Sequence, residues 1–341
     1  MTSSDDRISP LHGAGGEWMR KLLAEHVLPC FAKSPAGRID LSAMDDGATL
    51  RLPTSGELVM TTDSHVVKPI FFPGGDIGKL AAAGTLNDLA VMGAKPLALS
   101  LAVIIEEDFL IADIDRIVRS FADTLAGSEA ALICGDTKVM GRGELDGMVI
   151  NTTGIGIADP AIRDAGALPG DIIIVTGTMG DHGMALLAAR EEFRLETELT
   201  SDVASIWPMI RSVLPVGGIH AMKDPTRGGL AAALNEMARK SGTTVEIRQS
   251  DIPIRGAVQG LSDLLGISPL EVANEGKAVL IVDPEAADDI LAILRQHPVG
   301  REAAVIGHVG TEYPGRVVVT TDVGGRRFLD MPLGDPVPRI C

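Results

Sequence analysis

Residues 72–94 read FPGGDIGKLAAAGTLNDLAVMGA, and this stretch predicts a closely packed helix at about 77–92. Its small residues, above all the run AAAG at 81–84, allow a neighbouring element to approach the helix closely. The same helix carries Asn87 and Asp88 among apolar residues. Burying an unpaired carboxylate is strongly unfavourable, so a bound cation would satisfy Asp88.

Strand-like and helical segments alternate along the chain on both sides of this helix. The alternation favours an α/β fold with α+β layers over a β-sandwich or a helix bundle. A length of 341 residues allows two domains, and the polar stretch DPAIRDAGALPGD at 159–171 is the predicted junction. Strands are expected at 58–61, 97–104, 131–134, 148–157, 172–176, 244–248, 278–282, 303–309 and 317–321. Helices are expected at 17–28, 77–92, 110–126, 181–190, 203–213, 228–240 and 285–296.

The composition argues against several classes of protein. Hydrophobic residues make up 45% of the chain and charged residues 22%, which suits a packed core and excludes a disordered or fibrous protein. A net charge of −16 and an aromatic content of 3% disfavour binding to nucleic acid. The sequence has no signal region and no apolar run long enough for a membrane span. Its three dispersed cysteines favour a reducing, cytoplasmic location.

Three further aspartates lie at the predicted ends of apolar elements. Asp63 follows a strand in TTDSH, and Asp136 is expected just beyond the end of another strand in GDTK. Asp224 precedes a helix in DPTRGG, whose glycines would expose backbone N–H groups to an anion. Asp63 has the simpler alternative of capping a turn. Together with Asp88, these loop carboxylates suit a hard cation such as Mg²⁺ better than a soft metal, which would require Cys or His clusters.

Two glycine-containing segments and the last residue complete the set of candidates. The segment HGAGG at 12–16 would wrap phosphates with its backbone donors, or is simply a flexible loop. In NEGK, Glu275 is either a catalytic base or a partner for a nearby lysine at the surface. The terminal Cys341 ends a tail with two prolines and is either incidental or a tethered thiol that swings into a site.

In this order, seven motifs resemble those of the HypE family of hydrogenase maturation factors. The resemblance spans residues 12–341 and places the chain in the superfamily of aminoimidazole ribonucleotide synthetase, selenophosphate synthetase and thiamine-phosphate kinase. It implies a two-domain fold of the aminoimidazole ribonucleotide synthetase type, a homodimer built on the N-terminal domains, and ATP and Mg²⁺ near the domain junction. The motifs are HGAGG (12–16), TTDSHVV (61–67), FPGGDIGKLAAAGTLNDLAVMGA (72–94), GDTKV (135–139), DPTRGGLA (224–231), ANEGK (273–277) and PRIC (338–341).

The resemblance also implies a division of the chain into four parts. The expected parts are an N-terminal glycine-rich loop and helix (1–40), an ATP-binding and dimerisation domain (41–160), a C-terminal α/β domain (161–330) and a flexible tail (331–341) that ends in the acceptor cysteine.

The implied reaction takes place on the tail itself. A carbamoyltransferase partner, HypF, places a carbamoyl group on the terminal cysteine, and the family enzyme uses ATP to dehydrate it to a thiocyanate. The cyanide then passes to iron held by the HypC and HypD partners, as a ligand of the [NiFe]-hydrogenase centre. ATP is required because an amide oxygen leaves poorly, whereas its phosphorylated form leaves as phosphate.

The matched motifs imply a role for each candidate residue. Cys341 is the acceptor thiol, Glu275 the base, and Lys138 stabilises charge on the activated oxygen or tunes that base. Asn87 contacts nucleotide or its metal. The residues expected to hold Mg²⁺ and position the triphosphate are Asp63, Asp88, Asp136 and Asp224, and Gly13, Gly15 and Gly16 would cover the phosphates. His65 departs from the family pattern, in which an aromatic residue such as Phe or Tyr is expected.

Two alternatives compete with this interpretation. One is another enzyme of the superfamily, but a selenophosphate synthetase would carry a reactive Cys or selenocysteine in the loop that here reads HGAGG. The other is a scaffold or metal carrier without catalytic activity, which presents Cys341 to partners and predicts no nucleotide turnover.

Overall fold

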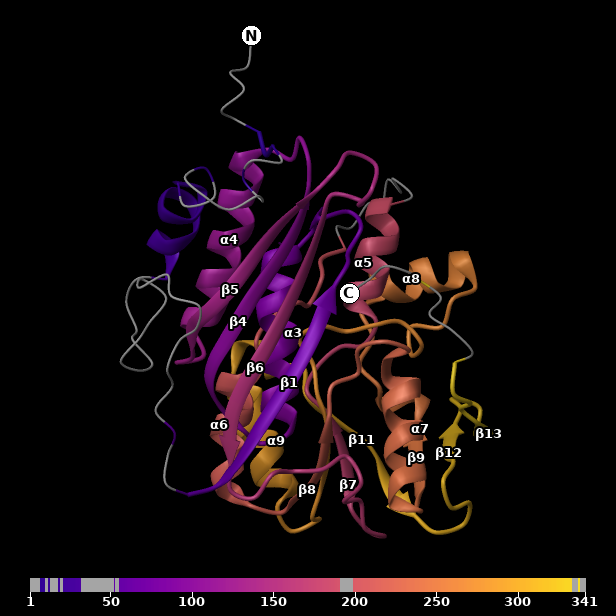
Figure 1. The fold of residues 1–341 in the computed structure, drawn as a ribbon. Coiled ribbons are helices and arrows are strands. Elements are labelled where there is room, and N and C mark those ends of the chain that lie inside the picture. Colours follow the sequence, from indigo (N-terminus) through magenta and orange to yellow (C-terminus); the bar gives the residue numbers. More distant parts are fainter. Residues whose placement is uncertain are drawn as a thin grey trace.

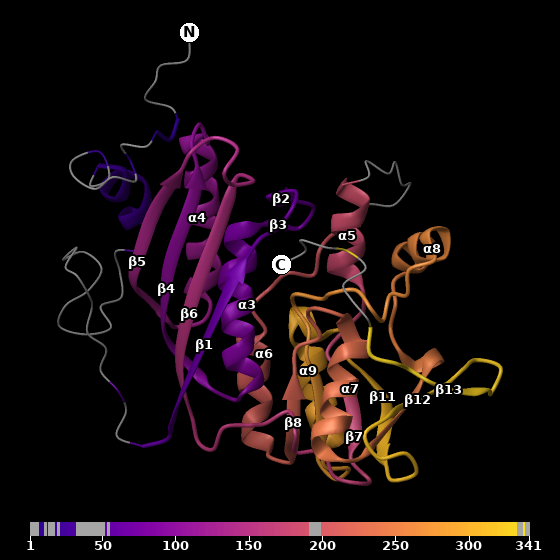
Figure 2. The same ribbon diagram turned by 45° about the vertical axis from the view of Figure 1, so that its right-hand side comes forward.

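The computed structural model describes residues 7–9, 12, 18, 21–31, 52, 55–190, 199–332 and 337. Two sheets, each packed against helices, form two domains that lie side by side (Figure 1). Figure 2 shows the N-terminal sheet and the C-terminal sheet on opposite sides of helix α3 (Ile77–Val91). The segment 159–171 between the domains contains no helix or strand. The predicted α/β class is confirmed.

The N-terminal domain contains a four-stranded sheet in the order β1-β6-β4-β5. Strands β4 and β5 are parallel, whereas β6 runs antiparallel to both β1 and β4. Helices α3 and α4 cover one face of the sheet, and the other face has no helix on it in the described part of the chain (Figure 1). The elements are β1 (Glu57–His65), β2 (Phe71–Phe72), β3 (Gly75–Asp76), α3, β4 (Lys95–Glu106), α4 (Ile111–Ala126), β5 (Ala131–Met140) and β6 (Met148–Ala158).

Helix α3 begins and packs as its sequence predicts. Asp76 caps it, because its Oδ1 accepts hydrogen bonds from the backbone N–H groups of Gly78 (2.9 Å) and Lys79 (3.0 Å). A Cβ atom on Gly78 would overlap the main-chain carbonyl of Ile117 in α4, so glycine lets the two helices touch. Helix α3 is buried on almost every side, which explains why its sequence is apolar all round.

The C-terminal domain contains a seven-stranded sheet in the order β13-β12-β9-β11-β7-β10-β8. All neighbouring strands are antiparallel except β9 and β12. Successive residues of β7 point to opposite faces of the sheet, and each face packs against different helices. Ile173 and Val175 lie in an apolar cluster with α7, whereas Ile174 lies in a cluster with α6 and α9. The elements are β7 (Ile172–Val175), α5 (Asp181–Arg190), α6 (Trp207–Val213), β8 (Ile219–Lys223), α7 (Gly229–Ser241), β9 (Thr244–Arg248), α8 (Gly256–Leu265), β10 (Val279–Val282), α9 (Ala287–Gln296), β11 (Ala304–Gly310), β12 (Val317–Thr320) and β13 (Arg326–Phe328).

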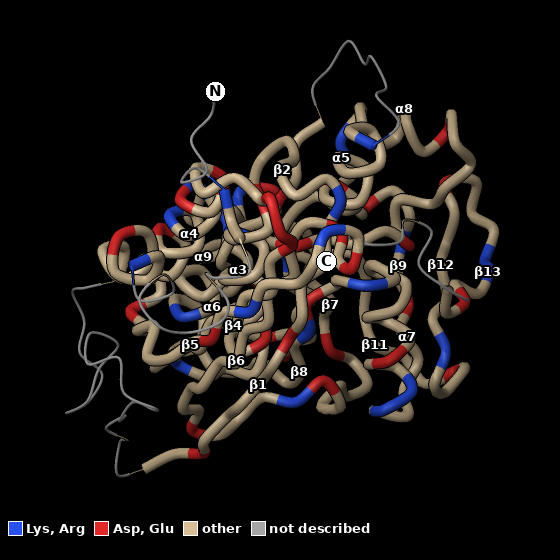
Figure 3. The backbone as a smooth tube through the Cα atoms, turned by 45° about the horizontal axis from the view of Figure 1, so that its top comes forward, with Lys and Arg blue, Asp and Glu red and all other residues tan. Residues whose placement is uncertain are grey.

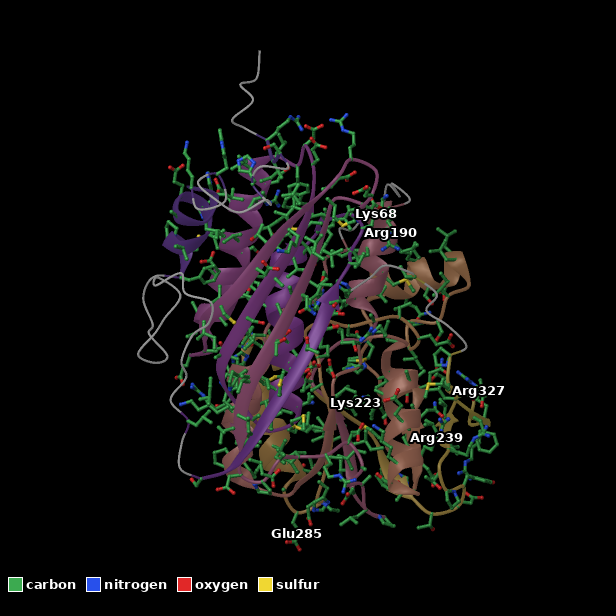
Figure 4. All side chains as sticks on the ribbon, in the orientation of Figure 1. Lys68, Arg190, Lys223, Arg239, Glu285 and Arg327 are labelled. Carbon is green, nitrogen blue, oxygen red and sulfur yellow. The ribbon has the colours of Figure 1, made fainter. Side chains whose placement is uncertain are left out.

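Contacts between the domains centre on α3. Ala90 and Val91 at its end belong to the apolar cluster of α6 and α9. Elsewhere, Arg190 at the end of α5 donates a hydrogen bond from Nε to the carbonyl of Lys68, and the two residues lie together in Figure 4. The helix that supplies Asn87 and Asp88 is therefore shared between both cores.

Several predicted boundaries were wrong. Asp63 lies within β1 and Asp136 within β5, not beyond the ends of strands. Helix α6 begins at Trp207 rather than at 203, and the predicted helix at 17–28 contains a π-helical turn at Leu23–Val27. Helix α8 and strands β2, β3, β8 and β13 were not predicted.

Candidate active site

Four acidic side chains from both domains meet at the junction. Asp63 on β1 and Asp88 on α3 come from the N-terminal domain, and Asp224 after β8 and Glu275 before β10 come from the C-terminal domain. Burial, followed by the charge of Asp224, raises the pKa of Asp88 to about 7. Burial also raises the pKa of Asp224, to which the charge of Asp63 adds. These carboxylates therefore lie close enough for their charges to repel one another, and Figure 3 shows acidic segments where the domains meet.

Polar neighbours hold the two N-terminal carboxylates in place. The hydroxyl of Thr61 donates a 2.6 Å hydrogen bond to Oδ2 of Asp88, and the backbone N–H of Ser64 donates a 2.8 Å bond to Oδ1 of Asp63. His65 is 1% exposed, and its Nε2 lies 3.8 Å from Oδ2 of Asp63. Burial lowers the pKa of His65, which disfavours the charged form of its imidazole, while the charge of Asp63 opposes the shift.

Glu275 is the most deeply buried of the four acids, with 2% of its surface exposed. Its Oε1 has no hydrogen-bond partner among the described residues. Burial raises the pKa of the Glu275 carboxyl well above its ordinary value, and the charges of Asp202, Asp224, Asp63 and Asp88 add to the effect. The alternative of a surface pair with a lysine is therefore wrong. A buried carboxyl with an unpartnered oxygen and a raised pKa is a candidate for proton transfer to or from a bound substrate.

The backbone of Glu275 is held from both sides. Asp202 accepts the N–H of Glu275 at Oδ1 (3.1 Å) and the N–H of Gly276 at Oδ2 (3.3 Å). The carbonyl oxygen of Glu275 accepts a 3.0 Å hydrogen bond from Nδ2 of Asn87. Lys277, 6% exposed, places its Nζ 3.5 Å from Oδ2 of Asp202. Sequence reasoning missed Asp202, which lies in no recognisable motif, whereas Lys277 is the last residue of NEGK.

The side-chain amide of Asn87 makes three hydrogen bonds, all to backbone groups of the protein. Nδ2 donates to the carbonyls of Glu275 and Ala204 (3.1 Å), and Oδ1 accepts the N–H of Ile206 (2.9 Å). The predicted contact of Asn87 with nucleotide or metal stays a prediction and would require this amide to exchange its partners.

Asp136 and Lys138 lie on the other face of the N-terminal sheet. In register, Asp136 is paired with Ala102, which is paired with Asn151, whose Nδ2 donates to the hydroxyl of Ser64. Asp63 is instead paired with Thr152, whose hydroxyl contacts Thr85 on α3. Side chains of paired residues share a face. The structure therefore does not bring Asp136 together with the other three aspartates within one chain.

The side chains of Asp136 and Lys138 are 58% and 62% exposed, and Lys138 Nζ lies 3.5 Å from Oδ1 of Asp136. Within one chain Asp136 therefore lies apart from Asp63, Asp88 and Asp224, and its predicted role in holding Mg²⁺ stays a prediction. The remaining catalytic and phosphate-binding predictions, Cys341, Gly13, Gly15 and Gly16, lie outside the described residues.

The predicted anion site at the start of α7 is partly occupied by the protein itself, and anion binding there stays a prediction. The N–H of Gly229 donates to the carbonyl of Thr226 (2.8 Å), and the N–H of Ala231 donates to that of Leu270 (2.8 Å). Two N–H groups of the first turn are therefore occupied by the protein. Lys223, just before Asp224, pairs with Glu236 of α7 at 3.0 Å and lies between the domains in Figure 4.

Comparison with known proteins shows the family to which the chain belongs. Models of the AIR synthase related proteins match the chain over 44–158 (N-terminal domain) and 169–320 (C-terminal domain). A putative hydrogenase expression/formation protein of Methanocaldococcus jannaschii is 51% identical, and the match covers 98% of this chain and 100% of that protein. The carbamoyl dehydratase HypE of Cupriavidus necator is 44% identical over 98% of this chain and 95% of its own. The chain belongs to the HypE family.

Solved HypE structures share its fold. A crystal structure of HypE in complex with ATP superimposes with a TM-score of 0.91 at 41% identity, over 97% of this chain and 99% of that one. The HypE chain of a HypE–HypF complex gives a TM-score of 0.79 at 39% identity, over 93% of this chain and all of that one. The predicted aminoimidazole ribonucleotide synthetase-like fold and the predicted family are confirmed. In the part of the chain that the structure describes, no helix is both long and apolar enough to cross a membrane.

Proposed function

We propose that this chain uses ATP to dehydrate an S-carbamoyl group on Cys341 to a thiocyanate, which supplies cyanide for the iron of a [NiFe]-hydrogenase. Membership of the HypE family of carbamoyl dehydratases supports this activity. The observation that carries it is Glu275, a buried carboxyl with an unpartnered Oε1 and a raised pKa at the domain junction. Such a group is suited to take protons from the amide nitrogen of a substrate that enters a water-poor site.

The reaction balances as two steps. The carbonyl oxygen of the thiocarbamate attacks the γ-phosphorus of ATP, so that an O–P bond forms, ADP leaves, and one N–H proton is lost. The C–O bond then breaks, phosphate leaves, and the second N–H proton passes to a base as the C≡N bond forms. Glu275 is our candidate for that base. The net change is the conversion of thiocarbamate and ATP into thiocyanate, ADP and phosphate.

We propose that Asp63, Asp88 and Asp224 hold Mg²⁺, which would neutralise charge on the triphosphate. The raised pKa values of Asp88 and Asp224 support this, because burial and neighbouring carboxylates disfavour their charged forms and a bound cation would relieve both effects. No three His, Cys, Asp or Glu side chains in the described residues are already close enough to form a metal site.

We propose HypF as the donor of the carbamoyl group and a HypC–HypD complex as the acceptor of the cyanide. The solved complex of a HypE relative with HypF supports the first partner. The HypC–HypD partner, the role of Gly13, Gly15 and Gly16 and the cytoplasmic location remain predictions from the sequence.

A homodimer would give Asp136 and Lys138 a function. The sheet face that carries them also exposes apolar side chains, with Leu58 at 56% and Met60 at 67% exposure. A second copy packed by two-fold symmetry against this face would bury that apolar surface. We propose that Asp136 and Lys138 then serve the acidic cluster of the partner chain.

The test is the mass of the C-terminal peptide after incubation with HypF, carbamoyl phosphate and ATP. The wild-type chain should gain a carbamoyl group and then lose one water, whereas the mass of Cys341→Ala should stay unchanged. Glu275→Gln should gain the carbamoyl group but retain the water. Normal water loss in Glu275→Gln would remove Glu275 from the mechanism, and carbamoyl uptake by Cys341→Ala would overturn the proposal as a whole.

A further inference from the structure

Three segments that are far apart in the sequence meet at the amide group of Asn87. The side chain extends from α3 of the N-terminal domain and is 2% exposed. All its partners are backbone groups of the C-terminal domain, namely the carbonyls of Ala204 and Glu275 and the N–H of Ile206. The side chain of Asn87 therefore joins the N-terminal domain to the C-terminal domain at Glu275.

A second side chain holds the same residue from the opposite side. Asp202 accepts the N–H groups of Glu275 and Gly276, and Lys277 lies against it. A Cβ atom on Gly276 would overlap the carbonyl of Asp202, so the backbone has little room to shift. Both polar groups of the Glu275 backbone are thus fixed, while Oε1 of its carboxyl has no partner in the described chain.

We propose that Asn87 is a positioning residue that fixes Glu275 from the N-terminal domain, rather than a ligand of the nucleotide. The Glu275 carboxyl then takes its working position only when the two domains are docked. The position is needed because a catalytic group displaced by about 1 Å can lose about 100-fold in rate. This inference rests on the proposed role of Glu275 as the base.

A matched control is present in the C-terminal domain. Asn235 of α7 is 4% exposed and donates both hydrogens of Nδ2 to backbone carbonyls, those of Ala231 and Leu329 (2.9 Å each). It is nearly as buried as Asn87 and makes two hydrogen bonds to the backbone where Asn87 makes three, but no bond to the acidic cluster is found among the described residues. Asn235→Ala therefore reports what the loss of such an amide does to stability alone.

The experiment measures two quantities for Asn87→Ala and Asn235→Ala. The first is the dissociation constant for ATP by calorimetry, and the second is the single-turnover rate of water loss from the carbamoylated tail at saturating ATP. We expect Asn87→Ala to bind ATP within about 3-fold of wild type and to dehydrate about 100-fold more slowly. Asn235→Ala should dehydrate at the wild-type rate, even if both variants lose similar stability.

Other outcomes overturn the inference in distinguishable ways. A dissociation constant for ATP raised tenfold or more in Asn87→Ala, with normal turnover at saturation, would make Asn87 a nucleotide ligand (tenfold is about 1.4 kcal/mol). A normal dissociation constant for ATP together with a normal rate of water loss would show that Asn87 has no role in the reaction. If Asn87→Ala does not fold, Asp202→Ala, which removes the acceptors of the Glu275 and Gly276 N–H groups, tests the same restraint from the other side, and an unchanged turnover rate there would count against it. Normal dehydration by Glu275→Gln would instead refute the proposed base.

Discussion

The hydroxyl of Thr61 donates a 2.6 Å hydrogen bond to Oδ2 of Asp88 and so joins strand β1 to helix α3 inside the acidic cluster. Burial and the charge of Asp224 raise the pKa of Asp88, and this hydrogen bond opposes them because it stabilises the ionised form. Thr61 therefore helps to keep Asp88 available as a carboxylate near neutral pH.

Replacing Thr61 by valine keeps the shape and removes the donor. The pKa of Asp88 should rise further, so a smaller fraction of it is ionised at pH 7. We expect the Mg²⁺ concentration for half-maximal ATP-dependent dehydration to rise roughly 5- to 10-fold, which corresponds to the net contribution of about 1 kcal/mol from a typical hydrogen bond. At pH 9 the difference should shrink, because Asp88 is ionised in both proteins. Thr124→Val on α4, where the hydroxyl contacts only the carbonyl of Ser120 in the described structure, is the control. An unchanged Mg²⁺ requirement at pH 7 would contradict this role.

Asp88 should also make stability depend on pH. Its pKa is about 7 in the folded chain, against about 3.9 when unfolded. The folded state binds the proton more tightly, so this contribution to stability is full below about pH 4 and is lost as pH rises through 7. Each unit of pKa shift corresponds to roughly 1.4 kcal/mol.

We therefore expect Asp88→Asn to gain in the free energy of unfolding, relative to wild type, between pH 5 and pH 8. Urea unfolding without Mg²⁺ measures this. Asp322→Asn, at an exposed position, should follow the wild-type profile. Parallel profiles for Asp88→Asn and wild type would show that Asp88 is not under strain from its neighbours.

The buried pair of Lys277 and Asp202 should be costly to break. Lys277→Met leaves the charge of Asp202 buried without its partner, which typically costs about 3–5 kcal/mol. Lys68→Met removes a partner from the exposed pair with Asp146 (2.9 Å) and should cost less than about 1 kcal/mol. Adding Asp202→Asn to Lys277→Met should recover part of the loss in urea unfolding. Equal costs for the two lysines would mean that water reaches the buried pair.

Two glycines in helices should respond in opposite ways to alanine. Gly78→Ala places a methyl group against the carbonyl of Ile117 and should destabilise the chain by about 1–3 kcal/mol. A Cβ atom on Gly260 in α8 would meet no described neighbour within 4 Å, so Gly260→Ala should stabilise by about 0.5–1 kcal/mol. Thermal unfolding separates the two results, and a stable Gly78→Ala would mean that α3 and α4 can move apart.

The proposed homodimer predicts complementation between two inactive variants. Asp136→Asn and Glu275→Gln should each dehydrate slowly alone, and mixed dimers should regain part of the activity because one site then contains both native residues. Met60→Asp should yield a monomer by light scattering, since it puts a charge in the apolar face. No recovery on mixing, with exchange of subunits verified, would place Asp136 in its own chain's chemistry or outside the reaction.

The sequence predicted the positions of helices and strands better than it predicted which face of a sheet each residue occupies. Helix α3 was predicted nearly to its last residue because its apolar run and its capping Asp76 are local signals. Asp63 and Asp136 both follow apolar runs, yet each lies inside a longer strand whose far half is polar, and the two face opposite sides of the sheet. Periodicity does not reveal which face a domain junction occupies. Asp202 was missed because its role depends on the backbone of Glu275, 73 residues away in sequence.

Val337 is the only described residue after Pro332, and it is fully buried in the apolar cluster that includes residues of α5 and α8. Cys341 is the fourth residue after Val337, so a fully extended chain would place the Cα atom of Cys341 no farther than about 14 Å from that of Val337. For the sulfur to reach a partner at a greater distance, Val337 would have to leave this apolar cluster. Exposing its side chain to water costs about 1.5–3 kcal/mol. The burial of Val337 therefore acts as a weak restraint on how far the C-terminal cysteine can travel.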